Sequence, residues 1–145
     1  MPGRVLGVDL GSKRIGIALS DSKRTVATPH GVVGRSPDPS RHRAEIAALV
    51  TEWDVALLVV GLPLSLDGSH GPAAEAALAE ARALGDATAL PVETYDERLT
   101  TVTAERTLIE QGLTAPERRR VVDQVAAAVL LQAWIDAQPP RSGHV

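Results

Sequence analysis

The feature that most constrains the fold is an uninterrupted apolar stretch in the middle of the chain, residues 55–60. Every side chain in it is apolar, so a strand built from it needs cover on both faces. This pattern is typical of buried parallel strands in sheets that carry helices on both sides. The chain has two Trp, one Tyr and no Phe, so Ala, Val, Leu and Ile must fill the core. We therefore expect an α/β fold with this strand at the centre of its sheet.

Strand signals dominate the first quarter of the chain. Apolar stretches at residues 4–10 and 15–20 flank a short turn that contains Gly, which predicts an antiparallel hairpin. A third strand over residues 25–34 contains Pro29 and Gly31, and these favour an edge position. The remaining periodic segments predict helices over about 44–53, 72–84, 102–111 and 116–137, and a last strand over 92–95.

This order of elements predicts a single domain. An antiparallel three-strand meander leads into two strand–helix crossovers, which gives a mixed five-stranded sheet with two parallel strands and helices on its flanks. We expect the domain to span residues 1–138 and to be followed by a flexible tail over residues 139–145.

The composition excludes several classes of chemistry. Because the chain has no Cys, it can form neither a disulfide nor a thiolate metal site, and it has no Cys nucleophile. Charged residues interrupt the apolar stretch at the N-terminus, which does not resemble a signal peptide. No apolar stretch approaches the roughly 20 residues that a membrane helix requires. We expect a soluble, cytoplasmic protein with no membrane partner.

The charge balance is mildly acidic, −3 from 15 basic and 18 acidic residues, which by itself disfavours nucleic-acid binding. The basic residues are clustered, however, and a cluster can bind a polyanion locally. Residues 118–120 are three consecutive Arg directly before an apolar helix. Short basic clusters also occur as ordinary solvated surface, so both interpretations stay open.

Asp9 lies within or at the end of the first predicted strand, among apolar neighbours. A buried carboxylate without a partner is costly, so this residue needs either a hydrogen-bonding role or a cation. One interpretation is a cap for the turn at residues 11–12. The other is a metal ligand on a rigid strand.

Glu97 follows the last predicted strand directly, and ligands in α/β sheets gather at the carboxyl ends of strands. Asp96 precedes it, so the two side chains should point to opposite sides if the strand continues. One could face a site while the other supports the loop. An ordinary helix cap with a first-turn acid explains the pair equally well.

Asp123 lies on the predicted last helix, in a stripe that it shares with Ala127, Leu130 and Trp134. Most of this helix is apolar, so the carboxylate needs a partner. Arg119, one turn earlier, or one of its Arg neighbours could form an ion pair with it. A metal ion is the alternative.

The three acids together suggest one site, although each alone is ambiguous. They fall on a first strand, after a late strand and on a last helix of one small domain. This set suits a phosphodiesterase that uses one or two metal ions. Hard oxygen ligands without a Cys or His cluster favour Mg²⁺ or Mn²⁺.

Four ordered motifs resemble the YqgF/RuvX family over nearly the whole chain, and they occupy residues 8–16, 60–68, 96–101 and 122–127. The resemblance implies a ribonuclease H-like fold. It implies a nuclease that is described for the family both as a pre-16S rRNA processing nuclease and as a Holliday-junction resolvase. It further implies that Asp9, Glu97 and Asp123 are the catalytic acids and the metal ligands.

Polar residues within or beside these motifs become candidate phosphate contacts, each of which could instead be ordinary surface: Lys13, Arg14, Ser65, Arg98 and Arg119. Gly11 and Gly16 could let the hairpin approach a nucleic-acid backbone, although turn geometry explains Gly11 equally well. The expected partner is structured RNA or branched DNA, and the protein is expected to be a monomer or a homodimer.

Two other classes remain. The segment at residues 9–12 also resembles the first phosphate-binding loop of sugar kinases and actin-like ATPases, but those proteins need two related domains. A non-catalytic module of the same fold could hold RNA, DNA or a protein partner. Such a module is expected to have lost an acid, whereas all three acids are present here.

Overall fold

The computed structural model describes residues 3–11, 13–65, 67–100 and 115–139, with the backbone alone for residues 115–120. The predicted helix over 102–111 and nearly all of the predicted tail therefore lie outside the described residues. The described part of the chain contains no helix that is both long and apolar enough to cross a membrane.

The sheet has five strands, as predicted, in the order β3-β2-β1-β4-β5. Strands β1, β2 and β3 form the antiparallel meander, while β4 pairs in parallel with both β1 and β5. The apolar stretch at residues 55–60 lies in β4, an interior strand next to the edge strand β5, whereas the expected central position is occupied by β1. The strands are β1 (Arg4–Leu10), β2 (Arg14–Ser20), β3 (Ala27–Gly34), β4 (Val55–Leu62) and β5 (Val92–Asp96).

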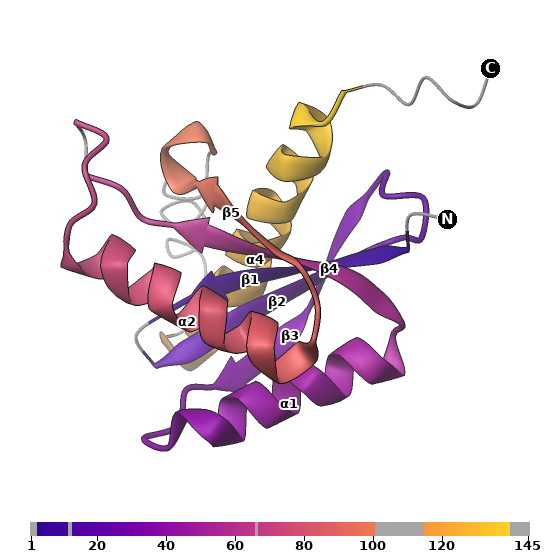
Figure 1. Ribbon diagram of the computed structural model, residues 1–145, viewed down its shortest axis with the longest axis horizontal. Coiled ribbons are helices and arrows are strands. Elements are labelled where there is room, and N and C mark those ends of the chain that lie inside the picture. Colours follow the sequence, from indigo (N-terminus) through magenta and orange to yellow (C-terminus); the bar gives the residue numbers. More distant parts are fainter. Residues whose placement is uncertain (1–2, 12, 66, 101–114, 140–145) are drawn as a thin grey trace.

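Helices cover both faces of the sheet (Figure 1). Helices α1 (Pro39–Glu52) and α2 (Pro72–Thr88) pack on one face, and α4 (Ala115–Ala137) packs on the other. A short 3-10 helix, η1 (Glu97–Leu99), follows β5. We refer to the two sides of the sheet as the α1/α2 face and the α4 face.

Several element boundaries differ from the prediction: α1 begins at Pro39 rather than at about residue 44, and β4 continues to Leu62. Two further differences have local reasons. The third strand begins at Ala27 rather than at residue 25, because the Asp21 carboxylate accepts hydrogen bonds from the backbone N–H groups of Thr25 and Val26 and holds them in a turn. Helix α2 continues past Gly85 to Thr88, and Ala89 ends it in the left-handed conformation. Gly85 thus lies inside the helix. An added Cβ there would lie 3.0 Å from the Val92 Cγ2 atom, so the missing side chain lets the helix approach Val92.

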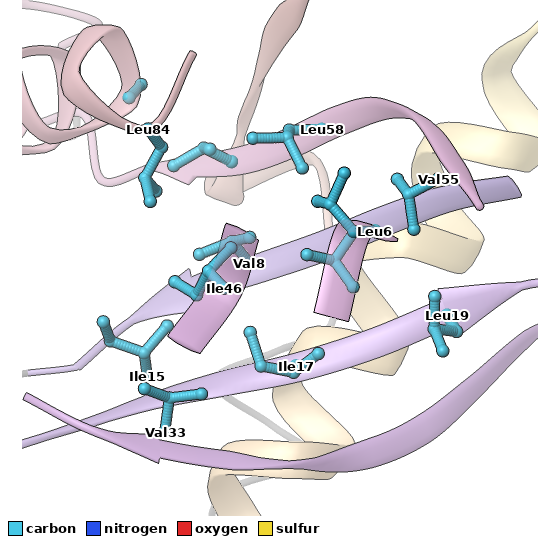
Figure 2. Close-up of a cluster of buried hydrophobic side chains, with 13 residues drawn as sticks. Leu6, Val8, Ile15, Ile17, Leu19, Val33, Ile46, Val55, Leu58 and Leu84 are labelled. Atoms are coloured by element: carbon cyan, nitrogen blue, oxygen red, sulfur yellow. The ribbon is translucent and has the colours of Figure 1, made fainter. Parts of the chain in front are cut away.

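The core is divided by the sheet. Aliphatic side chains of β1, β2 and β4 that point to the α1/α2 face pack against α1 and α2 (Figure 2). Alternate residues of the same strands point to the α4 face and pack against α4. On β1, Leu6 and Val8 belong to the first cluster and Val5 belongs to the second. This alternation decides which face receives each functional side chain.

Candidate active site

Asp9 lies near the carboxyl end of β1 and on the α4 face. Val5 packs on that face, and Gly7 lies so close to α4 that an added Cβ would stand 2.8 Å from the Leu131 Cβ. Two further residues along the strand, Asp9 points to the same side and is only 3% exposed. A carboxylate buried this deeply on a central strand needs compensation from hydrogen bonds or from a cation.

Glycines flank Asp9 on both neighbouring strands. On β2, Gly16 is its register partner. On β4, Gly61 follows directly after Val60, the partner of Val8, and it lines a pocket together with Asp9. The sheet therefore presents a buried carboxylate between two positions that carry no side chain.

Each of these glycines leaves space that another predicted acid uses. A Cβ added at Gly61 would lie 2.7 Å from Glu97 Oε1, so the Glu97 side chain covers that glycine. A Cβ added at Gly16 would lie 2.0 Å from the backbone oxygen of Asp123. Helix α4 therefore lies directly against β2 at the residue that carries the third acid. This packing brings all three acids to the same face of the sheet.

Asp9 and Glu97 line one pocket at the carboxyl ends of the strands, with a volume of about 280 Å³. Its wall also includes Gly11, Arg35 and the first turns of α2. The predicted clustering of Asp9 with Glu97 is thus present in the structure.

Asp123 pairs with an arginine of β2. Its carboxylate accepts a hydrogen bond of 2.8 Å from Arg14 Nε at the start of β2, and its side chain is 15% exposed. The ion pair that the sequence suggested, with Arg119 or its neighbours, involves side chains outside the described residues. Among the residues that are described, no cluster of three His, Asp or Glu side chains is arranged to hold a metal ion.

Asp96 ends β5 and Glu97 begins η1, so strand alternation does not continue to Glu97. The Asp96 carboxylate caps η1 by accepting from the Arg98 N–H at 2.9 Å, and it also pairs with the Arg98 guanidinium at 2.7 Å. The hydrogen bonds from the Arg98 side chain hold the pKa of Asp96 below its ordinary value. Asp96 is therefore the cap and Glu97 the first-turn acid of η1, and Glu97 also lines the pocket with Asp9.

The predicted phosphate contacts occupy different surroundings. Arg14 and Arg98 both pair with an acid, and Lys13 lies exposed in the turn between β1 and β2. Ser65 lies at an exposed loop, which its backbone closes through hydrogen bonds with Ser69 and Gly68. The side chain of Arg119 lies outside the described residues.

The surroundings of Gly16 and Gly11 explain why each position is a glycine. Gly16 does not offer its backbone to a nucleic acid, because the carbonyl of Asp123 occupies that position. The interpretation of close nucleic-acid approach at Gly16 was therefore wrong, and helix packing replaces it. At Gly11 an added Cβ would lie 2.4 Å from the Arg14 carbonyl oxygen, so turn geometry explains this glycine.

Arg35 is a pocket residue that the sequence analysis missed. It directly follows β3, lines the pocket with Asp9 and Glu97, and donates from Nη1 to the Gly11 carbonyl oxygen at 2.9 Å. A single Arg after an edge strand has no sequence signature. Only the return of β3 alongside β2 brings it to the carboxyl end of β1.

Comparison with known proteins identifies the family. A family model described as "RuvX: Holliday junction resolvase" matches residues 3–137. A relative from Anaeromyxobacter sp., named "Putative pre-16S rRNA nuclease", is 50% identical and the alignment covers 93% of this chain and 98% of that protein. A relative of the same name from Mycobacterium sp. is 45% identical over 98% of this chain and 88% of its own length.

The solved structures show the fold. RuvC of Thermus thermophilus in complex with a Holliday junction substrate superposes with a TM-score of 0.59 at 18% identity, covering 93% of this chain and 94% of RuvC. A second structure of Thermus thermophilus RuvC gives a TM-score of 0.56. The expected ribonuclease H-like architecture is confirmed. From its family match and its close relatives, the chain belongs to the RuvX (YqgF) family of nucleases.

Proposed function

We propose that this protein is a metal-dependent nuclease that processes the 5′ end of pre-16S rRNA in ribosome biogenesis, with Asp9, Glu97 and Asp123 as its catalytic acids. The observation that carries the proposal is the buried Asp9 between two glycines whose missing side chains leave room for the other two acids. The name shared by relatives at 43% to 50% identity supports the substrate. We further propose that the nuclease domain spans residues 1–138 and acts in the cytoplasm.

The donor set fits a hard divalent cation. All three proposed ligands are carboxylates, and oxygen donors favour Mg²⁺ or Mn²⁺. The burial of Asp9 supports the same assignment, because a cation would compensate its charge. Asp9 and Glu97 would hold the ion, and Asp123 would join them on leaving Arg14. Such an ion, when bound, activates a water molecule and stabilises the leaving oxygen of a phosphodiester.

Arg14 has a defined part in this proposal. Its guanidinium compensates the charge of Asp123 at a distance of 2.8 Å when no cation does so. With Asp123 on a cation, the Arg14 guanidinium would be available to a phosphate oxygen of the substrate, for which its planar fork is well suited. Arg14 therefore remains a candidate phosphate contact.

A second candidate substrate is the four-way DNA junction. The description of the matching family model favours it, and a RuvC structure of the same fold contains such a junction. Symmetrical cleavage of a junction would need a homodimer, whereas trimming of an RNA end would not. Oligomeric state is therefore part of the test between the two substrates.

The test compares both substrates in one assay. The purified protein with Mn²⁺ or Mg²⁺ should cleave an RNA that carries the 5′ precursor end of 16S rRNA faster than a four-way DNA junction. Asp9→Asn, Glu97→Gln and Asp123→Asn should each lower cleavage by at least about 100-fold, since even outer-shell changes at metal sites cost 10- to 100-fold. The matched control is Asp86→Asn, at an exposed position on α2, which should cleave normally.

Two outcomes would overturn parts of this proposal. Normal cleavage by the Asp9→Asn protein would remove Asp9 from the catalytic acids. Faster cleavage of the junction, by a protein that is dimeric in sedimentation, would replace the rRNA substrate with the second candidate.

A further inference from the structure

Arg35 is held at both ends within the pocket. Its backbone N–H donates to the Lys13 carbonyl oxygen at 2.9 Å, directly beyond the pairing of β2 with β3. Its Nη1 donates to the Gly11 carbonyl oxygen at 2.9 Å. The side chain is partly buried and lines the same pocket as Asp9 and Glu97. The guanidinium is therefore fixed at the wall of an acidic pocket rather than free in solvent.

Like Arg4 and Arg24, Arg35 donates to a backbone carbonyl oxygen. Its place in the wall of the pocket with Asp9 and Glu97 is what sets it apart from them. Arg14, Arg43 and Arg98 each pair with a carboxylate at 2.7 to 2.8 Å. Within the described residues, the Arg35 guanidinium has a carbonyl oxygen as its hydrogen-bond partner and pairs with no carboxylate. A guanidinium has five N–H donors in a rigid fork, and one bond to Gly11 leaves most of them for a further acceptor.

A purely structural role explains this placement poorly. The turn that Arg35 contacts already closes through its own backbone, because the Gly11 N–H donates to the carbonyl oxygens of Asp9 and Arg14 at 3.1 and 3.0 Å. The Gly11 carbonyl could accept from water instead of from an Arg. The bond from Arg35 therefore orients the guanidinium more than it completes the turn.

We propose that Arg35 binds a phosphate of the strand that enters the pocket of Asp9 and Glu97, and so positions that strand for cleavage. This inference rests on the proposed nuclease function. Two carboxylates in a pocket repel a phosphodiester, and a fixed cation in the same wall offsets this repulsion locally. The fork geometry of the guanidinium also orients the phosphate, which a Lys would not do.

The test measures binding apart from cleavage. In the Asp9→Asn background the substrate stays intact, and a fluorescently labelled RNA with the 5′ precursor end of 16S rRNA serves as the probe. Adding Arg35→Gln should weaken binding about tenfold, as expected for a charge-assisted hydrogen bond. It should also reduce the slope of log K against log salt by about one, the signature of one lost phosphate contact.

Two further variants make the result specific. The matched control is Arg82→Gln, since Arg82 is exposed on α2 and lines a separate pocket; it should keep both the affinity and the salt slope. Arg35→Lys in the Asp9→Asn background should restore the salt slope, because the slope counts charges. In the otherwise wild-type enzyme, Arg35→Lys should still lower kcat, because the fork is lost.

The outcomes separate this inference from the proposed function. If adding Arg35→Gln to the Asp9→Asn protein changes neither the affinity nor the salt slope, and Arg35→Gln alone leaves cleavage normal, the role of Arg35 is overturned and the nuclease proposal stands. A lower Tm without any change in binding would assign Arg35 to the turn instead. If Arg35→Gln fails to fold, the slope and kcat of the Arg35→Lys protein decide the same question. A protein that binds RNA through Arg35 but never cleaves it would overturn the nuclease proposal instead.

Discussion

Asp9 owes its surroundings to two residues that have no side chain. Neither Gly16 nor Gly61 has a positive φ, so backbone conformation does not require glycine at either position. Close approach does, because Glu97 covers one glycine and the backbone of Asp123 covers the other. The arrangement of the site therefore depends on the missing side chains of Gly16 and Gly61 as well as on the three acids.

The Gly61→Ala protein should fold but lose activity. The new methyl group would meet Glu97 Oε1 at 2.7 Å and Leu130 Cδ2 at 3.0 Å, and both are ends of flexible side chains that can move aside. We expect Glu97 to be displaced from the pocket, with cleavage lowered about 10- to 100-fold. A cleavage assay and a thermal melt on the same preparation measure both effects. Gly31→Ala, where an added Cβ meets nothing within 4 Å, is the control, and equal activity of the two variants would refute this role of Gly61.

Single residues differ in how much of their role the sequence predicts. The cap at Asp96 and the first-turn acid at Glu97 follow from the local chemistry of a helix start, and the structure shows both in η1. The pairing of Arg14 with Asp123 does not follow from any local rule, because 109 positions separate the two residues. The sequence pattern suggests Arg119 or one of its Arg neighbours instead, because helical spacing predicts only contacts within the same helix.

Helix α4 is the element that completes the site. It packs on the sheet through glycines of β1 and β2, with Gly7 beneath Leu131 and Gly16 beneath Asp123. Ala126, Ala127 and Ala128 on the same helix are buried, and their small side chains allow this close contact. The position of Asp123 relative to Asp9 is therefore a consequence of how closely a whole helix approaches two strands.

Gly16→Ala should destabilise the protein by displacing this helix. The added Cβ would lie 2.0 Å from the Asp123 carbonyl oxygen, and a backbone atom cannot rotate away as a side chain can. Overpacking of this kind costs about 1–3 kcal/mol of the free energy of unfolding. Urea denaturation measures the loss, with Gly31→Ala on β3 as the matched control. If both variants unfold at the same urea concentration, α4 does not depend on Gly16.

The elements were predicted best where the signal is local. Spacing and turn chemistry gave the three-strand meander, the edge position of β3 and the parallel β4, all confirmed by the pairing of the strands. The start of β3 was missed because the Asp21 side chain competes for the backbone N–H groups ahead of it. Which face of the sheet each helix covers depends on tertiary packing, and the sequence pattern did not specify it.

In the molecule as a whole, the candidate catalytic acids and the larger apolar cluster lie on opposite faces of the sheet. The α4 face carries Asp9 and Asp123, while the α1/α2 face carries the larger apolar cluster. Between α1 and α2 lies a buried charge cluster in which Glu80, 6% exposed, accepts from Arg43 Nη2 at 2.8 Å and lies 3.2 Å from His42 Nε2. This cluster joins two helices that cover the same face, so it bears on global stability.

Glu80 should make that stability depend on pH. Burial by itself raises the pKa of Glu80, but the hydrogen bonds from Arg43 and His42 outweigh it and lower the pKa below its ordinary value of 4.5. A carboxylate with a lowered pKa stabilises the folded state above the ordinary pKa, and this contribution is lost as the pH falls through the folded-state pKa.

The Glu80→Gln substitution should therefore lower the free energy of unfolding most at neutral pH and least at acidic pH. We expect the variant to lose about 2 kcal/mol of the free energy of unfolding at pH 7, a moderate value because Arg43 is partly exposed. The gap to the wild type should narrow as the pH falls from about 4.5 through the lowered folded-state pKa of Glu80. Over this range the carboxylate becomes protonated first in the unfolded chain and then in the folded protein. Urea denaturation at several pH values measures this gap.

Glu75→Gln on the same helix, where the side chain is 67% exposed, is the matched control and should show little loss of the free energy of unfolding at any pH. A gap that stayed constant between pH 7 and pH 3 would show that Glu80 acts through its shape and not through its charge.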